Sequence, residues 1–236
     1  FMIDKFSRRP FLYLLDGLNK SYFNPLVLKD IHKYQELSKE TSKKPENDRR
    51  VQVLKPFLPE FYNIFIENPY ELLNVNFGAQ FIQDVIFIYD IPEISNELRE
   101  KALEKVIDCV RGDLTSEEHL INKPYAARFY KALIQGGKWN RETKTVDEVP
   151  DIHLGFEFAT RFAEELFDFG NDQDKLTEWI KNKDASFVLV ALLDQFKANP
   201  KDANSKRFIS NLKKQAKLIK KQGDDNKGAK VLEGSL

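Results

Sequence analysis

Asp184-Ala185-Ser186-Phe187-Val188-Leu189-Val190 is the stretch that decides the fold, because two small residues are followed by a run of bulky apolar ones. Near the start of a helix, small residues let the backbone approach a neighbouring helix closely, and the bulky residues then fill the core between the two. The same pattern recurs in three other segments and more weakly in a fourth: Phe77–Gln83, Tyr125–Lys131, Lys227–Glu233 and Ser7–Tyr13. A recurring helical pattern predicts a repeat protein.

Helix signals also lie between these segments. Asn24 followed by Pro25 is typical of a helix start, and Val27, Ile31 and Tyr34 then follow at helical spacing, with Ser38 next along the same face. Another helix is expected over residues 48–66, where Pro56 and Pro59 must bend or split it. Two further apolar stripes predict helices, the second behind a Ser205 cap: Ile94, Leu98, Ala102, Val106 and Val110, and Phe208, Leu212, Gln215 and Ile219.

The chain is expected to contain little or no sheet, because no long stretch alternates apolar and polar residues. Residues 136–150 are the one obvious long connection and are expected to be an insertion loop, in which a short hairpin is conceivable but not predicted. The third position of each recurring segment marks the copies, at spacings of 43 to 70 residues: Arg9, Ala79, Ala127, Ser186 and Ala229. Because regular solenoids keep a fixed period, we predict one all-α domain over residues 1–236, an irregular α-solenoid of about four to five repeats.

Composition bounds the class of protein. The 236 residues carry 37 basic and 37 acidic side chains, and 42% are apolar, which is typical of a globular chain. The single Cys109 and the absence of a signal peptide indicate a reducing intracellular compartment. No apolar run approaches the length of a membrane span. Because the chain opens at Phe1 and not at an initiator Met, we expect it to be part of a longer protein.

Zero net charge means that any affinity for nucleic acid must come from a local patch, since nonspecific binders are usually basic overall. The richest basic run has no acid between Ser205 and Lys221, and Lys227 and Lys230 could extend it: Lys206, Arg207, Lys213, Lys214, Lys217, Lys220 and Lys221. Lys213, Lys217, Lys220 and Lys221 are expected to share one helix face. The alternative is an ordinary solvated face. A second candidate, Arg8 and Arg9 with Lys43, Lys44, Arg49 and Arg50, is diluted by Glu40, Glu46 and Asp48.

Gly136-Gly137-Lys138-Trp139-Asn140 directly follows a predicted helix, and glycine is natural at a helix end. Trp139 either packs over that helix end or forms, with Lys138, a loop that contacts a partner. Two glycines do not make a phosphate-binding loop here, because the preceding strand of the P-loop pattern is missing.

Catalytic and metal-binding patterns find little support. His32, His119 and His153 are scattered without metal-ligand spacing to Cys109 and are expected to be surface or capping residues. Thr115 with Glu118 reads as a helix capping box. The acidic side chains Glu157, Glu164, Glu165 and Asp168 are an ordinary solvated surface or a contact for basic proteins. We therefore expect no active site, no metal and no cofactor.

Several longer strings carry a closer resemblance: "DKFSRRPFLYLLDGLNKSYFNPLV" (4–27), "ELSKETSKK" (36–44), "KALIQGGKWN" (131–140), "NKDASFVLVALL" (182–193) and "NKGAKVL" (226–232). Together they are similar to the C-terminal region, including the CPL domain, of the Puf-A or penguin family of Pumilio-like proteins. The resemblance runs from Asp4 nearly to the C-terminus. It implies a nucleolar protein that acts in maturation of the large ribosomal subunit and binds RNA or DNA with little sequence preference. Translational repression of mRNA is a further implied role.

Pumilio repeats read single bases through three helix positions. Carried onto this chain, the positions form five triplets: Ala79/Gln80/Gln83, Ala127/Arg128/Lys131, Ser186/Phe187/Val190, Ala229/Lys230/Glu233 and, in the partial copy, Arg9/Pro10/Tyr13. None is complete, because alanine and valine cannot hydrogen-bond a base edge, whereas Arg128 and Lys131 suit phosphate. The sequence therefore predicts phosphate contacts without base-by-base recognition.

Three hypotheses remain. The first is an RNA-binding factor of large-subunit assembly that contacts pre-rRNA, ribosomal proteins and assembly factors as a monomer within a larger particle. The second is a protein-interaction scaffold with no nucleic-acid contact. The third is an RNA-modifying or hydrolytic enzyme. Salt-dependent RNA binding separates the first two.

Overall fold

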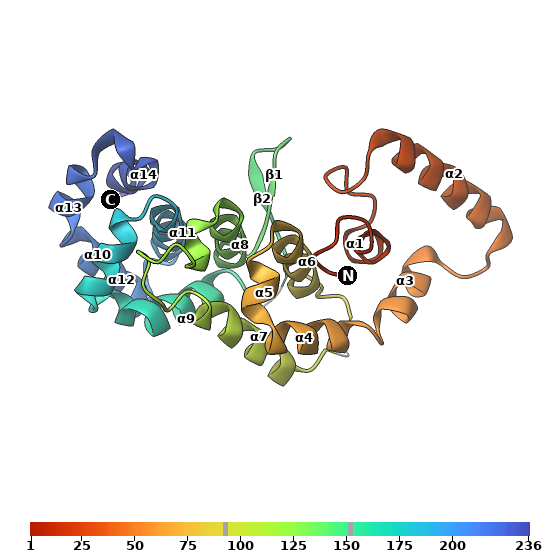
Figure 1. Cartoon of the computed structure of the whole chain (residues 1–236), viewed down its shortest axis with the longest axis horizontal. Coiled ribbons are helices and arrows are strands. Elements are labelled where there is room, and N and C mark those ends of the chain that lie inside the picture. The colour runs from red at the N-terminus through yellow and green to blue at the C-terminus, as the bar shows by residue number, and fades with distance from the viewer. Residues whose placement is uncertain (92–93, 151–152) are drawn as a thin grey trace. The chain divides into compact units, whose positions relative to one another are not determined.

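The computed structural model describes residues 1–91, 94–150 and 153–236, and their backbone is predominantly helical (Figure 1). It divides into two compact units, residues 1–102 (unit 1) and 103–236 (unit 2). Unit 1 contains α1 (Arg9–Asp16), α2 (Pro25–Thr41), α3 (Glu46–Leu54), α4 (Leu58–Glu67), α5 (Pro69–Leu73) and α6 (Asn76–Ile86), and the boundary falls within α7 (Asn96–Asp108).

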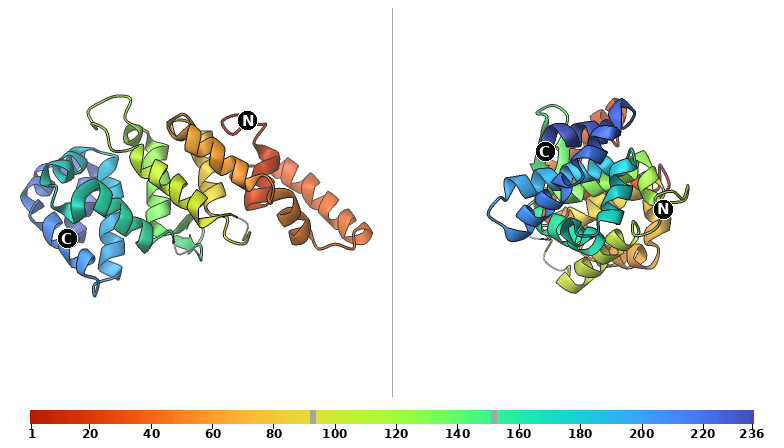
Figure 2. Two further views of the ribbon diagram at one scale, coloured as in Figure 1. Left: turned by 90° about the horizontal axis from the view of Figure 1, so that it is seen from below. Right: turned by 90° about the vertical axis from the view of Figure 1, so that its left-hand side faces the viewer.

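Unit 2 is likewise helical apart from one two-stranded hairpin. Its elements are η1 (Leu120–Asn122), α8 (Pro124–Gln135), β1 (Gly137–Asn140), β2 (Thr145–Glu148), α9 (Phe156–Phe167), η2 (Asp168–Gly170), α10 (Gln173–Lys181), α11 (Ala185–Ala198), α12 (Ala203–Lys213), α13 (Ala216–Lys221), η3 (Gly223–Asp225) and α14 (Lys227–Ser235). The helix α11 packs against both α8 and α14 (Figure 1 and Figure 2). The predicted all-α class of helical repeats is confirmed.

The small residues of the recurring pattern permit close helix contacts, as predicted. A Cβ added at Gly78 in α6 would lie 2.2 Å from the Leu72 carbonyl oxygen of α5. A Cβ added at Gly228 in α14 would lie 2.1 Å from the Ser186 hydroxyl of α11 and 2.9 Å from the Phe187 backbone nitrogen. Only glycine leaves room for these backbones to meet. The small residues of the pattern therefore mark the places where two helices pack most closely.

Each unit has an aromatic core. In unit 1, the Phe61 ring of α4 lies 5.3 Å from that of Phe11 and 5.2 Å from that of Phe81, both close to edge-on. In unit 2, Trp179 is fully buried, with its ring 5.7 Å from Phe162 and 5.2 Å from Phe167. Edge-to-face pairs of this kind add about 0.5–1.5 kcal/mol each beyond the burial of their surface. Phe11 and Phe81, two bulky residues of the pattern, thus join α1 and α6 to α4.

Two local predictions about helix ends are confirmed. The Asn24 side chain caps α2, because its Oδ1 accepts a hydrogen bond of 2.9 Å from the Val27 backbone nitrogen. The helix expected over residues 48–66 is split around Pro56 into α3 and α4, and Pro59 lies in the first turn of α4. Proline has no N–H to donate, so it is tolerated at a helix start and not inside.

Other helix boundaries differ from the predictions. Ile94 and Val110 are buried but lie outside α7, because the apolar stripe continues past both helix ends. Asp202, not Ser205, caps α12, since Asp202 Oδ1 accepts from the Ser205 nitrogen at 2.9 Å. Thr115 starts no helix. Instead, Asp113 Oδ1 accepts from the Thr115 nitrogen at 2.8 Å within a turn that precedes η1.

Residues 136–150 contain a β-hairpin, which corrects the expected loop. Gly137 pairs with Glu148 and Asn140 with Thr145 in an antiparallel ladder. Gly136 ends α8 in the left-handed conformation, with φ of 75°, as expected for glycine after a helix. A Cβ at Gly137 would lie 2.2 Å from the Asp147 carbonyl oxygen, so the second glycine lets the two strands close. The insertion loop is therefore a β-hairpin, β1–β2.

Candidate nucleic-acid interface

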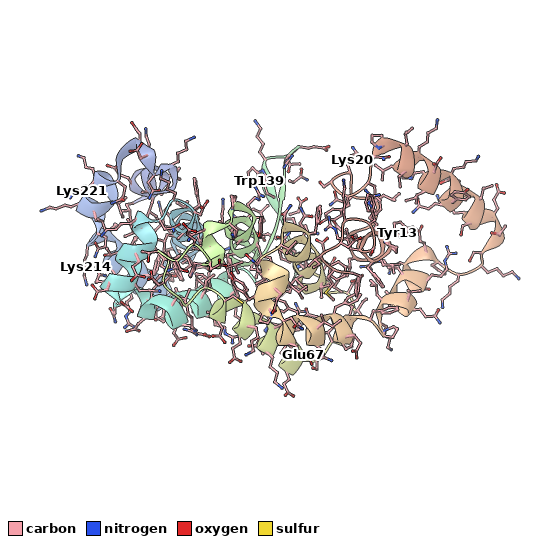
Figure 3. All side chains as sticks on the ribbon, viewed as in Figure 1. Tyr13, Lys20, Glu67, Trp139, Lys214 and Lys221 are labelled. Carbon is pink, nitrogen blue, oxygen red and sulfur yellow. The ribbon has the colours of Figure 1, made fainter. Side chains whose placement is uncertain are left out.

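The predicted basic run lies on α12, α13 and α14 of unit 2. The apolar residues Phe208, Leu212 and Ile219 are buried and anchor these helices to the core. The predicted cations of the run are all exposed: Lys206, Arg207, Lys213, Lys214, Lys217, Lys220, Lys221, Lys227 and Lys230. Figure 3 shows Lys221 pointing away from unit 2. Residues 203–236 hold these nine cations against three acids, so this end of unit 2 is strongly positive.

The prediction that four lysines share one helix face is wrong, because these lysines lie on two different helices. The helix α12 ends at Lys213 and α13 begins at Ala216, so Lys213 is separated from Lys217, Lys220 and Lys221. Tertiary hydrogen bonds hold this break. Asn211 Nδ2 donates to the Phe169 carbonyl oxygen at 3.0 Å, and Gln215 bonds to Gln173. The cations therefore lie on successive short helices.

Ion pairing separates these cations into two groups. Arg207 lies 3.2 Å from the Asp168 carboxylate and above the Phe169 ring, and Lys230 pairs with Asp224, which raises the Lys230 pKa. The other seven have no acidic partner among the residues that the structure describes, although Lys214 donates to the Asn211 amide oxygen at 2.7 Å. We call these seven the C-terminal lysine surface: Lys206, Lys213, Lys214, Lys217, Lys220, Lys221 and Lys227. Their charge is open to an anion from outside the described chain.

Four of the positions that would read bases are used for packing. Ala79, Ala127 and Ala229 are buried. The Ser186 hydroxyl donates to Asn226 Oδ1 at 2.9 Å and is fully buried between α11 and α14. Arg128 remains exposed, and the Lys131 ammonium lies 5.7 Å from the centre of the Phe187 ring. Of these side chains, Arg128 and Lys131 alone keep a charge that could meet phosphate.

Arg8 cannot serve as the phosphate contact that the sequence predicted. Its side chain is 5% exposed, and its guanidinium stacks over the Phe77 ring at 4.2 Å. Its NH1 donates to the Phe77 carbonyl oxygen at 3.2 Å and to Gln80 Oε1 at 3.1 Å. Burial lowers the Arg8 pKa, and burial beside Asp84 raises that of Tyr22 well above its ordinary value. Arg8 is thus a structural residue that joins α1 to α6.

The other cations of the second basic candidate are partly engaged within the fold and partly exposed. Arg9 is half-buried, with its guanidinium 4.9 Å from the centre of the Phe6 ring. Arg50 pairs with Asp90 at 2.8 Å, and Arg49 donates to the Ser38 hydroxyl at 3.0 Å. Lys43 and Lys44 are exposed. Only part of this set therefore presents free charge to solvent.

Trp139 does not pack over the end of α8, which was one of its two predicted roles. It lies opposite Val146 on the hairpin, and 58% of its surface is exposed (Figure 3). Lys138 neighbours it on β1. The other predicted role of Trp139, a contact with a partner, therefore stays a prediction.

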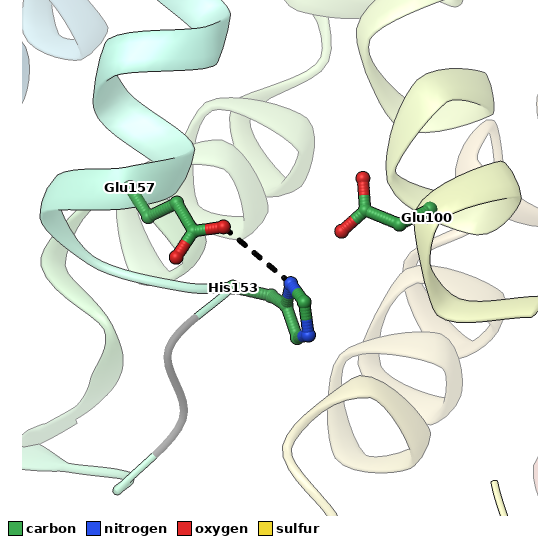
Figure 4. Close-up of side chains that lie close together, drawn as sticks. All are labelled: Glu100, His153 and Glu157. Carbon is green, nitrogen blue, oxygen red and sulfur yellow. Dashed lines mark ion pairs between the residues drawn. The ribbon is translucent and has the colours of Figure 1, made fainter. Parts of the chain in front are cut away.

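The histidines and the acidic block take part in local structure. His119 Nδ1 accepts from the Ile121 nitrogen at 3.2 Å and caps η1, and burial lowers the His119 pKa. Figure 4 shows His153 beside Glu157, with Nδ1 and Oε1 3.5 Å apart. Glu165 pairs with both Arg111 and Arg161. Much of the predicted acidic surface is therefore engaged within unit 2.

No described helix combines the length and apolar character that crossing a membrane requires. The CPL (NUC119) domain model matches residues 3–144, which include unit 1 from residue 3 onward, α8 and β1. The chain is 38% identical over 238 aligned positions to "Pumilio homology domain family member 6" of Saccharomyces cerevisiae, a match that covers 98% of this chain and 35% of that relative. No solved structure matches. The resemblance to Pumilio-like proteins is confirmed, and the chain belongs to the CPL (NUC119) domain family.

Proposed function

We propose that this chain binds RNA through its phosphate backbone, with little sequence preference. The observation that carries the proposal is the C-terminal lysine surface, whose seven charges have no acidic partner within the described residues. Lysine is a point charge that suits phosphate and reads no base edge. The buried Ser186 and alanines at base-reading positions support the same conclusion, because these four side chains cannot reach a base edge.

The biological setting that we propose is assembly of the large ribosomal subunit in the nucleolus, with pre-rRNA, ribosomal proteins and assembly factors as partners. This setting rests on the resemblance of the sequence to the Puf-A or penguin family. The relationship to a Pumilio homology protein supports RNA binding alone, and the chain spans about a third of that relative's length. On this proposal the chain is a monomeric binding module of a larger particle and not an enzyme, and binding to mRNA is a second use of the same surface.

The test measures fluorescence anisotropy of a labelled single-stranded RNA with the whole chain over a series of salt concentrations. If about four to six lysines contact phosphate, log affinity should fall with log salt with a slope of about −3 to −4. Reversal of four charges, Lys213→Glu, Lys217→Glu, Lys220→Glu and Lys221→Glu, should weaken binding by more than about tenfold and flatten the slope. Exchange of the RNA sequence at constant length should change affinity little.

A matched control keeps the same change in net charge but moves it to exposed lysines elsewhere: Lys5→Glu, Lys29→Glu, Lys33→Glu and Lys144→Glu. This control should bind RNA much more tightly than the first variant. Equal weakening in both variants would mean that only net charge matters, and the lysine surface would lose its role. A salt slope near zero would reject phosphate binding altogether.

The second candidate function, a protein-interaction scaffold, rests on the exposed Trp139 of the hairpin. Trp is enriched at the centres of protein interfaces and is seldom left uncovered. RNA binding that is unchanged in the Trp139→Ala variant, together with loss of a partner protein, would assign the hairpin to protein contact.

A further inference from the structure

The helix α2 of unit 1 leaves its apolar stripe only partly covered, with Val27 and Ile31 half-buried and Tyr34 exposed. It is 17 residues long, and none of its residues is buried. Val27, Ile31 and Tyr34 follow one another at helical spacing and line a groove of about 1200 Å³, which α1 and α3 close on the other side. Tyr13 and Leu14 of α1 and Val53 of α3 line the facing wall. A surface helix ordinarily buries such a stripe against its own domain.

A defined polar network holds the groove at one end. Gln35 of α2 donates to the Tyr13 hydroxyl and to Glu46 Oε1, at 2.9 Å in each case, and Tyr13 donates to the same Glu46 oxygen at 2.8 Å. Arg49 of α3 donates to the Ser38 hydroxyl of α2 at 3.0 Å. These bonds bridge α2 to α1 and α3 through long side chains. The helices are thus tied together at a spacing that leaves their apolar faces apart.

The rim of the groove is positively charged. Six cations line it against a single acid, Glu46: Arg9, Lys39, Lys43, Lys44, Arg49 and Arg50. Glu46 is already shared by Tyr13 and Gln35. Lys39 pairs with Glu36 and Arg50 with Asp90, while Lys43 and Lys44 lie exposed without an acidic partner in the described part of the chain. An apolar floor within a basic rim is complementary to an apolar ligand with acidic flanks.

We propose that this groove binds an acidic amphipathic helix of a partner protein. An α-helix is about 10 Å across and rises 1.5 Å per residue, so 1200 Å³ corresponds to about three turns. Three turns present apolar side chains at i, i+4 and i+7, which would meet the stripe of Ile31 and Tyr34. Asp or Glu residues beside that stripe would reach Lys43, Lys44 and Arg9. The apolar floor favours protein over RNA, whose phosphates would leave the floor uncovered.

The probe is a fluorescently labelled, side-chain-stapled helix of about three to four turns with leucine at i, i+4 and i+7 and glutamate on both flanks. Its twin carries lysine in place of each glutamate. Titrated against the whole chain, the acidic peptide is expected to bind at least about tenfold more tightly than the basic twin, because the rim is cationic. Equal affinity for the two peptides, or binding of neither, overturns the proposal.

Variants of the chain locate the binding. Ile31→Asp should abolish peptide binding, and Lys43→Glu with Lys44→Glu should weaken it about tenfold. Lys29→Glu with Lys33→Glu is the matched control, since both residues are exposed on the other side of α2 and should leave binding unchanged. Circular dichroism checks that each variant folds. Peptide binding that survives Ile31→Asp in a folded chain moves the site elsewhere and overturns the proposal.

Two further outcomes identify a different occupant and also overturn it. Concentration-dependent dimerisation that Ile31→Asp removes would assign the groove to a second copy of the chain. RNA binding that the Lys43→Glu, Lys44→Glu variant weakens, without peptide binding, would assign the rim to nucleic acid. Charge reversal on the C-terminal lysine surface should leave peptide binding unaltered, so this proposal and RNA binding fail independently.

Discussion

Unit 1 and unit 2 are built from the same kind of helix but leave different surfaces uncovered. Nine of the eleven exposed large apolar side chains of the described chain lie in unit 1, and α2 buries none of its residues. In unit 2, α11 buries eight of its fourteen residues, and lysine dominates the exposed surface of α12 to α14. An exposed apolar face is typical of a protein-binding surface, whereas exposed positive charge is typical of a phosphate-binding surface. The two units are thus suited to different partners.

The largest expected effect comes from the close packing of unit 2. In the Gly228→Val variant the new side chain meets Ser186 Oγ at 2.1 Å, and that hydroxyl is held by Asn226. We expect the free energy of unfolding, measured by urea denaturation, to fall by about 3 kcal/mol. Gly234→Ala in the same helix is the control, because nothing lies within 4 Å of its Cβ, and it should stabilise by up to about 1 kcal/mol. Equal effects of the two would show that α14 is not closely packed.

The next largest effect concerns unit 1, where Arg8 is structural. Arg8→Ala removes the stacking on Phe77 and two hydrogen bonds, and it should destabilise unit 1 by about 2–3 kcal/mol. Hydrogen exchange should show the loss in α1 and α6, while RNA affinity at the lysine surface stays unchanged. Arg9→Ala provides the comparison and should cost less than about 0.5 kcal/mol. A fall in RNA affinity without a fall in stability would return Arg8 to the binding surface.

The smallest effect is a pH dependence of unit 2. Burial lowers the pKa of His119, so the folded state takes up a proton less readily than the unfolded state. Stability is therefore full above the unfolded pKa of about 6.5 and falls as the pH drops from there towards the folded pKa. Denaturation between pH 7.5 and 5.5 should show this fall, and His119→Gln should reduce it. His32→Gln, at an exposed position in unit 1, should leave the pH profile as it is.

Local chemistry made part of the fold predictable. The Asn24 cap and the split around Pro56 depend on residues within a few positions of each other, and both predictions are confirmed. The Ser205 cap was misplaced by three residues, because Asp202 offers a better oxygen to the same turn. The break between α12 and α13 could not be read locally, since the bonds that hold it reach back to Phe169 and Gln173.

The candidate sites also contain features that nearby residues make predictable and features that depend on distant residues. The exposure of the lysines after Ser205 could be predicted, because that run contains no acidic residue. The sequence did not distinguish Arg8 from Lys206, and both are predicted as phosphate contacts. Arg8 is buried because Phe77 and Gln80, 69 and 72 residues further along the chain, accept and cover its guanidinium. The stripe of α2 was recognised as apolar, yet nothing in it indicated that no other helix would cover it. A partnerless face can be seen only after every neighbouring helix has been placed.

By itself the sequence determined the helical class, the small residues that set the closest helix contacts and the excess of charge at the C-terminal end. These properties depend on residue type and on spacing within a few turns. Tertiary structure decided which arginine is buried, where α12 ends, that residues 137–148 close into a hairpin and that α2 leaves a groove beside α1 and α3. Apart from the hairpin, whose pairs lie 5 to 11 residues apart, each of these depends on contacts between residues far apart in the chain. Helical periodicity encodes neither kind of contact.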